Sequence, residues 1–219
     1  MSSVWTAGFE PGDFSECGGS SAGSPTVQGT IVNSGSKAAK FPSGAAAYKE
    51  STTGLNLPTA YFRLYVYLAA SPTERDFAGF ASNLDLSIAS FLVTNSGNIK
   101  TFNSVTSTTL GTGSAVIPVT TWTLVEFKLV ISATVGVVEV KVGGAVDQTY
   151  TGLNTGVLNT DRIFFGPDNG NLSTDIYYDD LAVDDAGYPG AVPSSSVSVS
   201  PSRQTIQQYY EPEPIVYVF

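Results

Sequence analysis

Histidine is absent from this chain, and cysteine is nearly so. None of its 219 residues is histidine, and the only cysteine is Cys17. Without histidine, the commonest general base is missing, together with every serine–histidine or cysteine–histidine nucleophile. A histidine-containing zinc site and a four-cysteine zinc site are both excluded. A lone cysteine also has no intramolecular disulfide partner, so packing alone must stabilise the fold.

Charge and long apolar runs are also scarce. Charged residues make up 13% of the chain, and the formal net charge is −9. An acidic surface repels phosphates, so we expect no nucleic-acid partner. No apolar run approaches the ~20 residues that span a bilayer, so we expect no membrane partner. The first residues, MSSVWTAGF, lack a basic segment and an apolar core, so no secretion signal is expected.

Alternation of apolar and polar residues is the strongest positive signal. Within residues 121–131, Val125, Phe127 and Leu129 alternate with Glu126 and Lys128. Residues 60–68, 86–94, 98–102, 137–144, 161–166 and 175–185 also read as strands, and clusters of Gly, Ser, Thr, Asn and Pro separate them. We therefore predict an all-β fold, a two-sheet antiparallel jelly-roll sandwich with almost no helix. Its core is expected to contain Phe62, Leu64, Val66, Phe127, Leu129, Val140 and Leu181.

Composition divides the chain into three parts. We expect a jelly-roll domain over residues 1–188, a Ser/Pro/Val linker over 189–203 and an extended C-terminal attachment segment over 204–219. An exposed apolar strand invites aggregation, so this tail should rest on another surface. It could return as an edge strand of its own domain, but docking on a neighbouring subunit is preferred. The docking residues would be Tyr209, Tyr210, Ile215, Val216, Tyr217, Val218 and Phe219.

Several stretches follow one another in a recognisable order: GFEPGD at 8–13, TW at 121–122, the strand over 137–144, DRIFFG at 161–166 and YDDLAVD at 178–184. Together they resemble the concanavalin A-like lectin/glucanase superfamily, in its laminin-G-like jelly-roll branch, over about residues 4–187. The resemblance implies a curved sandwich whose concave sheet often binds glycans. Members include lectins, binding modules and some glycanases, and similar domains decorate bacteriophage particles.

Glycanases of that superfamily place carboxylates along one strand, because glycoside hydrolysis needs two carboxyl groups about 5–10 Å apart. Only Glu74 has an aspartate two residues on, Asp76, and Ala78 stands in the region where a third carboxylate would be needed. The pair follows a proline-containing segment and is interpreted as a charged turn. Glu126 and Glu139 alternate with core residues and are interpreted as solvent-facing charges. We therefore expect no enzyme activity and no catalytic residue.

The closing strand contains a carboxylate among apolar neighbours. By period two, Asp179 shares a face with Tyr177, Leu181 and Val183. A buried carboxylate must be hydrogen-bonded, paired with a cation or bound to metal. Because the first and last strands of jelly rolls commonly lie side by side, a structural Ca²⁺ is one interpretation, and no other cofactor is required. The alternative is that Asp179 accepts backbone N–H bonds or pairs with Lys or Arg. The predicted Ca²⁺ ligands are Glu10, Asp13, Asp179 and Asp180.

The best glycan-binding candidate in the sequence is the polar face of the strand over residues 60–68. This face consists of Tyr61, Arg63, Tyr65 and Tyr67. Sugars stack on aromatic rings, and a planar guanidinium orients hydroxyl or carboxylate groups. The alternative interpretation is that these side chains pack on the sheet surface or contact another subunit.

Two functions remain open. The first is a non-enzymatic structural or decorating protein on the surface of a virus particle such as a phage. Capsid or other virion subunits would bind the C-terminal tail, and a homo-oligomer is also open. A lectin-like sandwich without a secretion signal favours this role, because a virion protein is made in the host cytoplasm and released by lysis. The alternative is a carbohydrate-binding module or lectin for surface glycans, alone or as the adhesive function of that particle.

Overall fold

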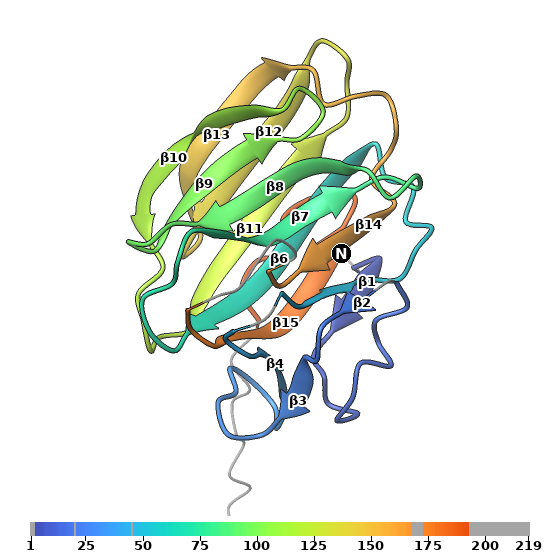
Figure 1. The fold of residues 1–219 in the computed structure, drawn as a ribbon. Helices are drawn as coiled ribbons and strands as arrows, with labels where there is room; N and C mark the ends of the chain where they lie inside the picture. Colours follow the sequence, from blue (N-terminus) through green and yellow to red (C-terminus); the bar gives the residue numbers. More distant parts are fainter. Residues whose placement is uncertain (1–2, 20, 45, 168–172, 193–219) are drawn as a thin grey trace, which may run out of the picture.

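The computed structural model of the chain describes residues 3–19, 21–44, 46–167 and 173–192. All the regular elements in these ranges are strands. Accordingly, no helix among the described residues is long and apolar enough to cross a membrane. The strands form two antiparallel sheets, and Figure 1 shows β7, β8, β9 and β10 in front of β6 and β11. This arrangement confirms the predicted all-β sandwich.

The eight-stranded sheet has the order β13-β12-β11-β6-β15-β4-β3, and β1 pairs with β15 beside this path. The first and last strands are therefore neighbours, as expected for a jelly roll. Their bounds are β1 Trp5–Ala7, β3 Thr26–Gln28, β4 Ala38–Phe41, β6 Thr59–Leu68, β11 Thr123–Val130, β12 Gly136–Val142, β13 Ala145–Leu153 and β15 Ile176–Asp184.

The seven-stranded sheet has the order β10-β9-β8-β7-β14-β5-β2. The predicted strands over 86–94 and 98–102 correspond to β8 and β9, and these two strands are paired. The bounds are β2 Ser21–Ala22, β5 Tyr48–Glu50, β7 Arg75–Ala81, β8 Ser87–Val93, β9 Asn98–Asn103, β10 Thr108–Val116 and β14 Arg162–Phe165.

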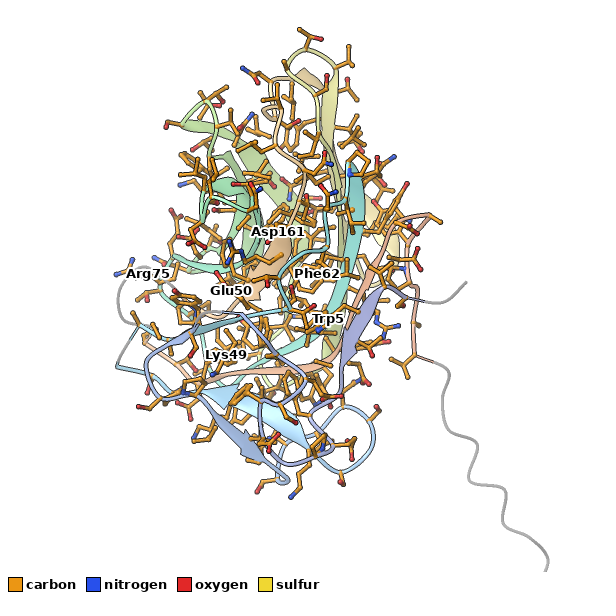
Figure 2. All side chains as sticks on the ribbon, turned by 90° about the vertical axis from the view of Figure 1, so that its right-hand side faces the viewer. Trp5, Lys49, Glu50, Phe62, Arg75 and Asp161 are labelled. Atoms are coloured by element: carbon orange, nitrogen blue, oxygen red, sulfur yellow. The ribbon has the colours of Figure 1, made fainter. Side chains whose placement is uncertain are left out.

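The core lies between the sheets and is rich in phenylalanine. All seven core residues predicted from alternation are at most 1% exposed, which confirms that they belong to the core. Phe127 of β11 lies where the two sheets meet. Its ring stacks on that of Phe91 with 4.0 Å between centroids and also contacts Phe62 and Phe77. Figure 2 shows Phe62 in the interior between the sheets.

Strand β15 contains a β-bulge that period-two counting does not detect. Its register against β6 shifts between Asp179 and Ala182. As a result Tyr178, before the bulge, and Leu181, after it, both belong to the core. Tyr177 lies instead on the outer face of the sheet, where its ring contacts aromatic and cationic side chains. The prediction that Tyr177 and Leu181 share one face was wrong because the extra residue of a bulge reverses the parity.

Candidate functional site

Two of the four predicted metal ligands bind a loop of the chain itself. An Oδ atom of Asp179 accepts the backbone N–H groups of Asn33, at 2.9 Å, and Ser34, at 3.2 Å. Asp180 accepts the side-chain amide of Asn33 at 2.8 Å and the hydroxyl of Ser34 at 2.7 Å. Asp179 therefore has the backbone N–H partners that were the alternative to a metal. The loop enters at the bulge, between the part of β15 that pairs with β4 and the part that pairs with β1.

The other two predicted ligands are also engaged by nearby chain segments. Glu10 accepts the backbone N–H of Ser36 at 3.0 Å and its hydroxyl at 2.8 Å, and Asp13 accepts the N–H of Ser15 at 2.9 Å. Hydrogen bonds from Ser36 lower the pKa of Glu10. Within the described ranges, no group of three or more His, Cys, Asp or Glu side chains could hold a metal ion. The Ca²⁺ prediction therefore has no ligand cluster in that part of the chain.

Burial sets the electrostatics of the Asp179 carboxyl, which has no exposed surface. Desolvation and, second, the neighbouring charge of Asp180 raise its pKa to about 7. The backbone N–H groups of Asn33, Ser34 and Asp180 favour the charged form and act in the opposite direction. The burial effect is the larger, so this carboxyl takes up a proton near neutral pH.

The tyrosine face of β6 is largely covered by residues 187–192, which we call the C-terminal strap. The strap contacts Tyr61, Arg63 and Tyr65. The ring of Tyr188 packs edge-on against the first of these with 5.0 Å between centroids. The carbonyl of Gly190 accepts a guanidinium N–H at 3.0 Å, and a second guanidinium N–H goes to the carbonyl of Asp180. The strap therefore gives these side chains the packing role that was the alternative to sugar binding.

Charged side chains of β11 and β12 hold the strap in place. Glu126 accepts the backbone N–H of Gly190 at 2.8 Å, and Glu139 accepts the hydroxyl of Tyr188 at 2.7 Å. The ammonium of Lys141 lies 3.5 Å from the centroid of the Tyr188 ring. Glu126 is only 3% exposed, so its interpretation as a solvent-facing charge was wrong, because the strap covers it. Residues 189–192 of the predicted linker thus contact the sheet.

Of the four predicted glycan-binding residues, Tyr67 differs from the others in having no contact with the strap in the part of the chain that the structure describes. Its ring contacts Trp122 at 5.6 Å and Tyr177 at 5.7 Å between centroids, and it is half-buried. The ammonium of Lys40 lies over the Tyr177 ring. A sugar-binding role for Tyr67 stays a prediction.

The outer face of the seven-stranded sheet carries a hollow of about 400 Å³, which we call the sheet groove. Strand register creates it. Gly79, Ser90, Phe102 and Thr109 stand opposite one another across β7, β8, β9 and β10, so their side chains share one face. The groove is lined by Asp76, Ser87, Ser90, Leu92, Lys100, Phe102, Ser104 and Thr109.

Two aromatic rings border the row around Ser90. Gly79 pairs with Phe164 of β14, and the Phe164 ring lies against this glycine in the space that a Cβ atom would take. On the other side of Gly79 stands Ser90, and beyond it the half-buried ring of Phe102. The row therefore places two small residues between two aromatic rings. Because the Phe164 ring fills the space over Gly79, a ligand in the groove would lie over Ser90 and beside the Phe102 ring.

Three serine hydroxyls form a connected cluster in the groove wall. The Oγ of Ser87 lies 3.0 Å from that of Ser90 and 3.0 Å from that of Ser104, and the last two are 3.3 Å apart. A hydroxyl both donates and accepts, and its proton can rotate. The cluster can therefore exchange hydrogen bonds with a hydroxyl-rich ligand in more than one arrangement.

The other side of the groove is charged. Asp76, Leu92 and Lys100 are opposite one another on β7, β8 and β9. The ammonium of Lys100 pairs with Glu74 at 2.7 Å. The interpretation of Glu74 and Asp76 as a turn was wrong for Asp76, because β7 begins at Arg75 and carries Asp76 into the groove. No third carboxylate follows on this strand, where buried apolar residues continue.

Known proteins resemble the chain in fold. No family profile and no curated protein matches its sequence. A sialidase structure has a TM-score of 0.57 at 11% identity, covering 85% of this chain and 19% of that chain. The receptor binding domain of botulinum neurotoxin type G gives 0.56 at 10% identity, covering 84% and 48%. Domain 4 of AbnA, a GH43 extracellular arabinanase from Geobacillus stearothermophilus solved with arabinotriose, gives 0.51 at 14% identity, covering 82% and 93%.

These likenesses define the fold class. The chain has the concanavalin A-like jelly-roll sandwich that the sequence resemblance predicts. It spans less than half of the neurotoxin chain and a smaller part of the sialidase chain. A fold of this class hosts several activities, so function has to be argued from the site.

Proposed function

We propose that the protein is a non-enzymatic carbohydrate-binding domain whose sheet groove holds an oligosaccharide. The observation that carries this proposal is the groove itself, in which an aromatic ring, a serine hydroxyl cluster and charged side chains share one sheet face. Ligand sites commonly combine apolar contact surface with a few placed polar groups. The arabinanase domain of the same fold was solved with a bound oligosaccharide, which supports the same ligand class here.

Each part of the groove has a role in this proposal. The ring of Phe102 offers an apolar surface for the C–H face of a pyranose or furanose. The hydroxyls of Ser87, Ser90 and Ser104 exchange hydrogen bonds with sugar hydroxyls. Lys100 and Asp76 supply a donor and an acceptor at the charged side. Binding replaces water at all of these groups, so affinity comes from the combined contacts rather than from any one bond.

Replacing Phe102 by alanine is expected to weaken oligosaccharide binding roughly tenfold, because stacking on an aromatic ring adds about 0.5–1.5 kcal/mol beyond the area buried. Titration calorimetry with arabinotriose, xylotetraose and cellotetraose measures the change for whichever probes bind. Tyr67→Ala is the matched control, because it removes a half-buried aromatic ring from the opposite sheet. Loss of binding in Tyr67→Ala alone would move the site to the tyrosine face of β6.

Catalysis is expected to be absent. The chain has no histidine, and of the carboxyl groups beside the groove Glu74 is paired with Lys100. Glycoside hydrolysis requires a carboxyl group that acts as the acid and a second one that acts as nucleophile or base, with separately tuned pKa values. Incubation with the same oligosaccharides, and with uronate polymers, should release neither reducing ends nor unsaturated products. Turnover that disappears in Asp76→Asn would contradict this expectation.

The role on a virus particle, with virion subunits as partners and the virion surface as location, stays a prediction. Its main support is the apolar tail, and the predicted docking residues lie outside the described residues. They are Tyr209, Tyr210, Ile215, Val216, Tyr217, Val218 and Phe219. The groove is compatible with an adhesive function in either setting.

A further inference from the structure

A second hollow of about 540 Å³ adjoins the sheet groove. The two hollows share Ser87 and Ser104, so a ligand that covers these two serines can contact both. The character of the lining changes at this junction. Beyond the two serines the walls include Leu86, Val105 and Val157, which are 57%, 42% and 78% exposed. We call this second space the apolar hollow.

The β7–β8 turn forms one wall of the apolar hollow, and a buried arginine holds this turn in place. Arg162 is 6% exposed and binds the carboxylate of Asp85 at 2.6 Å and the carbonyl of Ser82 at 3.1 Å. The same guanidinium pairs with Glu50 and approaches Asp161, which Figure 2 labels. Asp85 has a φ of 59°, a backbone conformation that needs such support. The turn that carries Leu86 is therefore held in one shape before any ligand arrives.

The opposite wall is anchored in a similar way. Thr155 is 1% exposed, and its hydroxyl donates to the carbonyl of Val130 at 2.8 Å and accepts the N–H of Ser132 at 2.9 Å. This fixes the start of the segment that carries Val157. A preformed hollow lowers the ordering cost of binding. Exposed apolar side chains in fixed positions also gain free energy when a ligand removes them from water.

We infer that the ligand of the groove is an acetylated oligosaccharide, with one acetyl methyl group seated in the apolar hollow. This rests on the proposed function. An unsubstituted sugar would place hydroxyls against Leu86, Val105 and Val157, which offer no hydrogen-bond partner, and would bury little apolar surface there. An acetyl group fits the change in lining. Its carbonyl accepts a hydrogen bond from Ser87 or Ser104 at the junction, and its methyl group continues past them.

Matched pairs of neutral oligosaccharides test this inference. Cellotetraose and chitotetraose share a β-1,4 backbone and differ in the N-acetyl group, and xylotetraose can be compared before and after chemical O-acetylation. In calorimetric titrations of the full chain, the acetylated member of at least one pair should bind about tenfold more tightly, the scale of one buried methyl group plus one hydrogen bond. The two pairs distinguish an N-acetyl from an O-acetyl ligand.

Substitutions in the apolar hollow test whether the preference for an acetylated oligosaccharide arises there. Val105→Thr combined with Val157→Thr keeps the side-chain shape but replaces a methyl group by a hydroxyl at each wall, and should reduce the preference below twofold. Val135→Thr is the matched control, because Val135 is 69% exposed, lies outside the apolar hollow and should leave the preference intact.

The outcomes separate the two proposals. Equal affinity within both pairs, with binding still sensitive to Phe102→Ala, overturns the acetyl inference and leaves the carbohydrate function standing. A preference that survives the double substitution also overturns it, because the acetyl group would then lie elsewhere. Absence of binding to every probe overturns the proposed function and this inference with it.

Discussion

Replacing Phe127 by alanine is expected to lower the free energy of unfolding by about 3–5 kcal/mol, the usual range for a fully buried phenylalanine. The ring has no exposed surface and stacks on Phe91 with 4.0 Å between centroids. Rings from both sheets surround it, including Phe62 at 5.7 Å and Phe77 at 6.1 Å. Small collapse of these rigid neighbours cannot fill the space, so a cavity should remain where the sheets meet.

Urea unfolding measures this change at constant pH. Phe102→Ala serves as the comparison, because the same atoms are removed from a half-buried ring on the outer sheet face. We expect its effect on stability to be well under half as large. A loss below about 1.5 kcal/mol for Phe127→Ala would mean that the core repacks around the missing ring and is less tightly filled than the contacts indicate.

The stability of the protein is expected to fall by about 2–3 kcal/mol as the pH rises from 5 to 8. The cause is Asp179, whose burial raises its pKa in the folded state to about 7, against an ordinary value of 3.8. The folded state therefore holds a proton over a range in which the unfolded state has lost it. Stabilisation is complete below the unfolded pKa and is lost as the pH passes through the folded pKa. No histidine titrates in this window.

Asp179→Asn should flatten this dependence, because asparagine does not ionise. The stability of the variant is expected to change little between pH 5 and pH 8, although its NH₂ group cannot accept the N–H that one carboxylate oxygen accepts in the wild type. Asp13→Asn is the control; Asp13 is exposed and its pKa is lowered by Ser15, so it acts only at lower pH. Thermal unfolding between pH 5 and 8 gives the slopes. A wild-type stability that rises with pH would show that the N–H groups of Asn33 and Ser34 outweigh burial.

Strands with one buried face could be predicted from the sequence because apolar and polar residues alternate regularly along them. Strand β6 alternates between buried and half-buried residues along its whole length, and β11 does so over most of its length. Strands β10 and β13 were not predicted individually. Most of their residues are exposed or half-buried, so they carry little apolar pattern. The β15 bulge was missed because nothing in a local pattern of apolar residues marks an inserted residue.

The groove could not be predicted because its members come from strands far apart in the chain. Only the register of β7, β8, β9 and β10 brings Gly79, Ser90 and Phe102 into one row. One local signal was available. In β9, Ile99 and Thr101 are buried, and Phe102 shares the exposed parity with Lys100. A single aromatic ring among the solvent-facing residues of a strand does not by itself indicate a binding surface, but it could have directed attention to this sheet.

The C-terminal strap and the sheet groove lie on opposite faces of the sandwich. Val192 donates its N–H to the hydroxyl of Tyr65, so the described chain ends on the outer face of the eight-stranded sheet. The sheet groove lies on the outer face of the other sheet. A support joined directly at residue 192, such as a sensor chip or a bead, would therefore lie on the side of the sandwich opposite the groove. The groove of a chain attached in this way would face the surrounding solution and stay open to long polysaccharide chains.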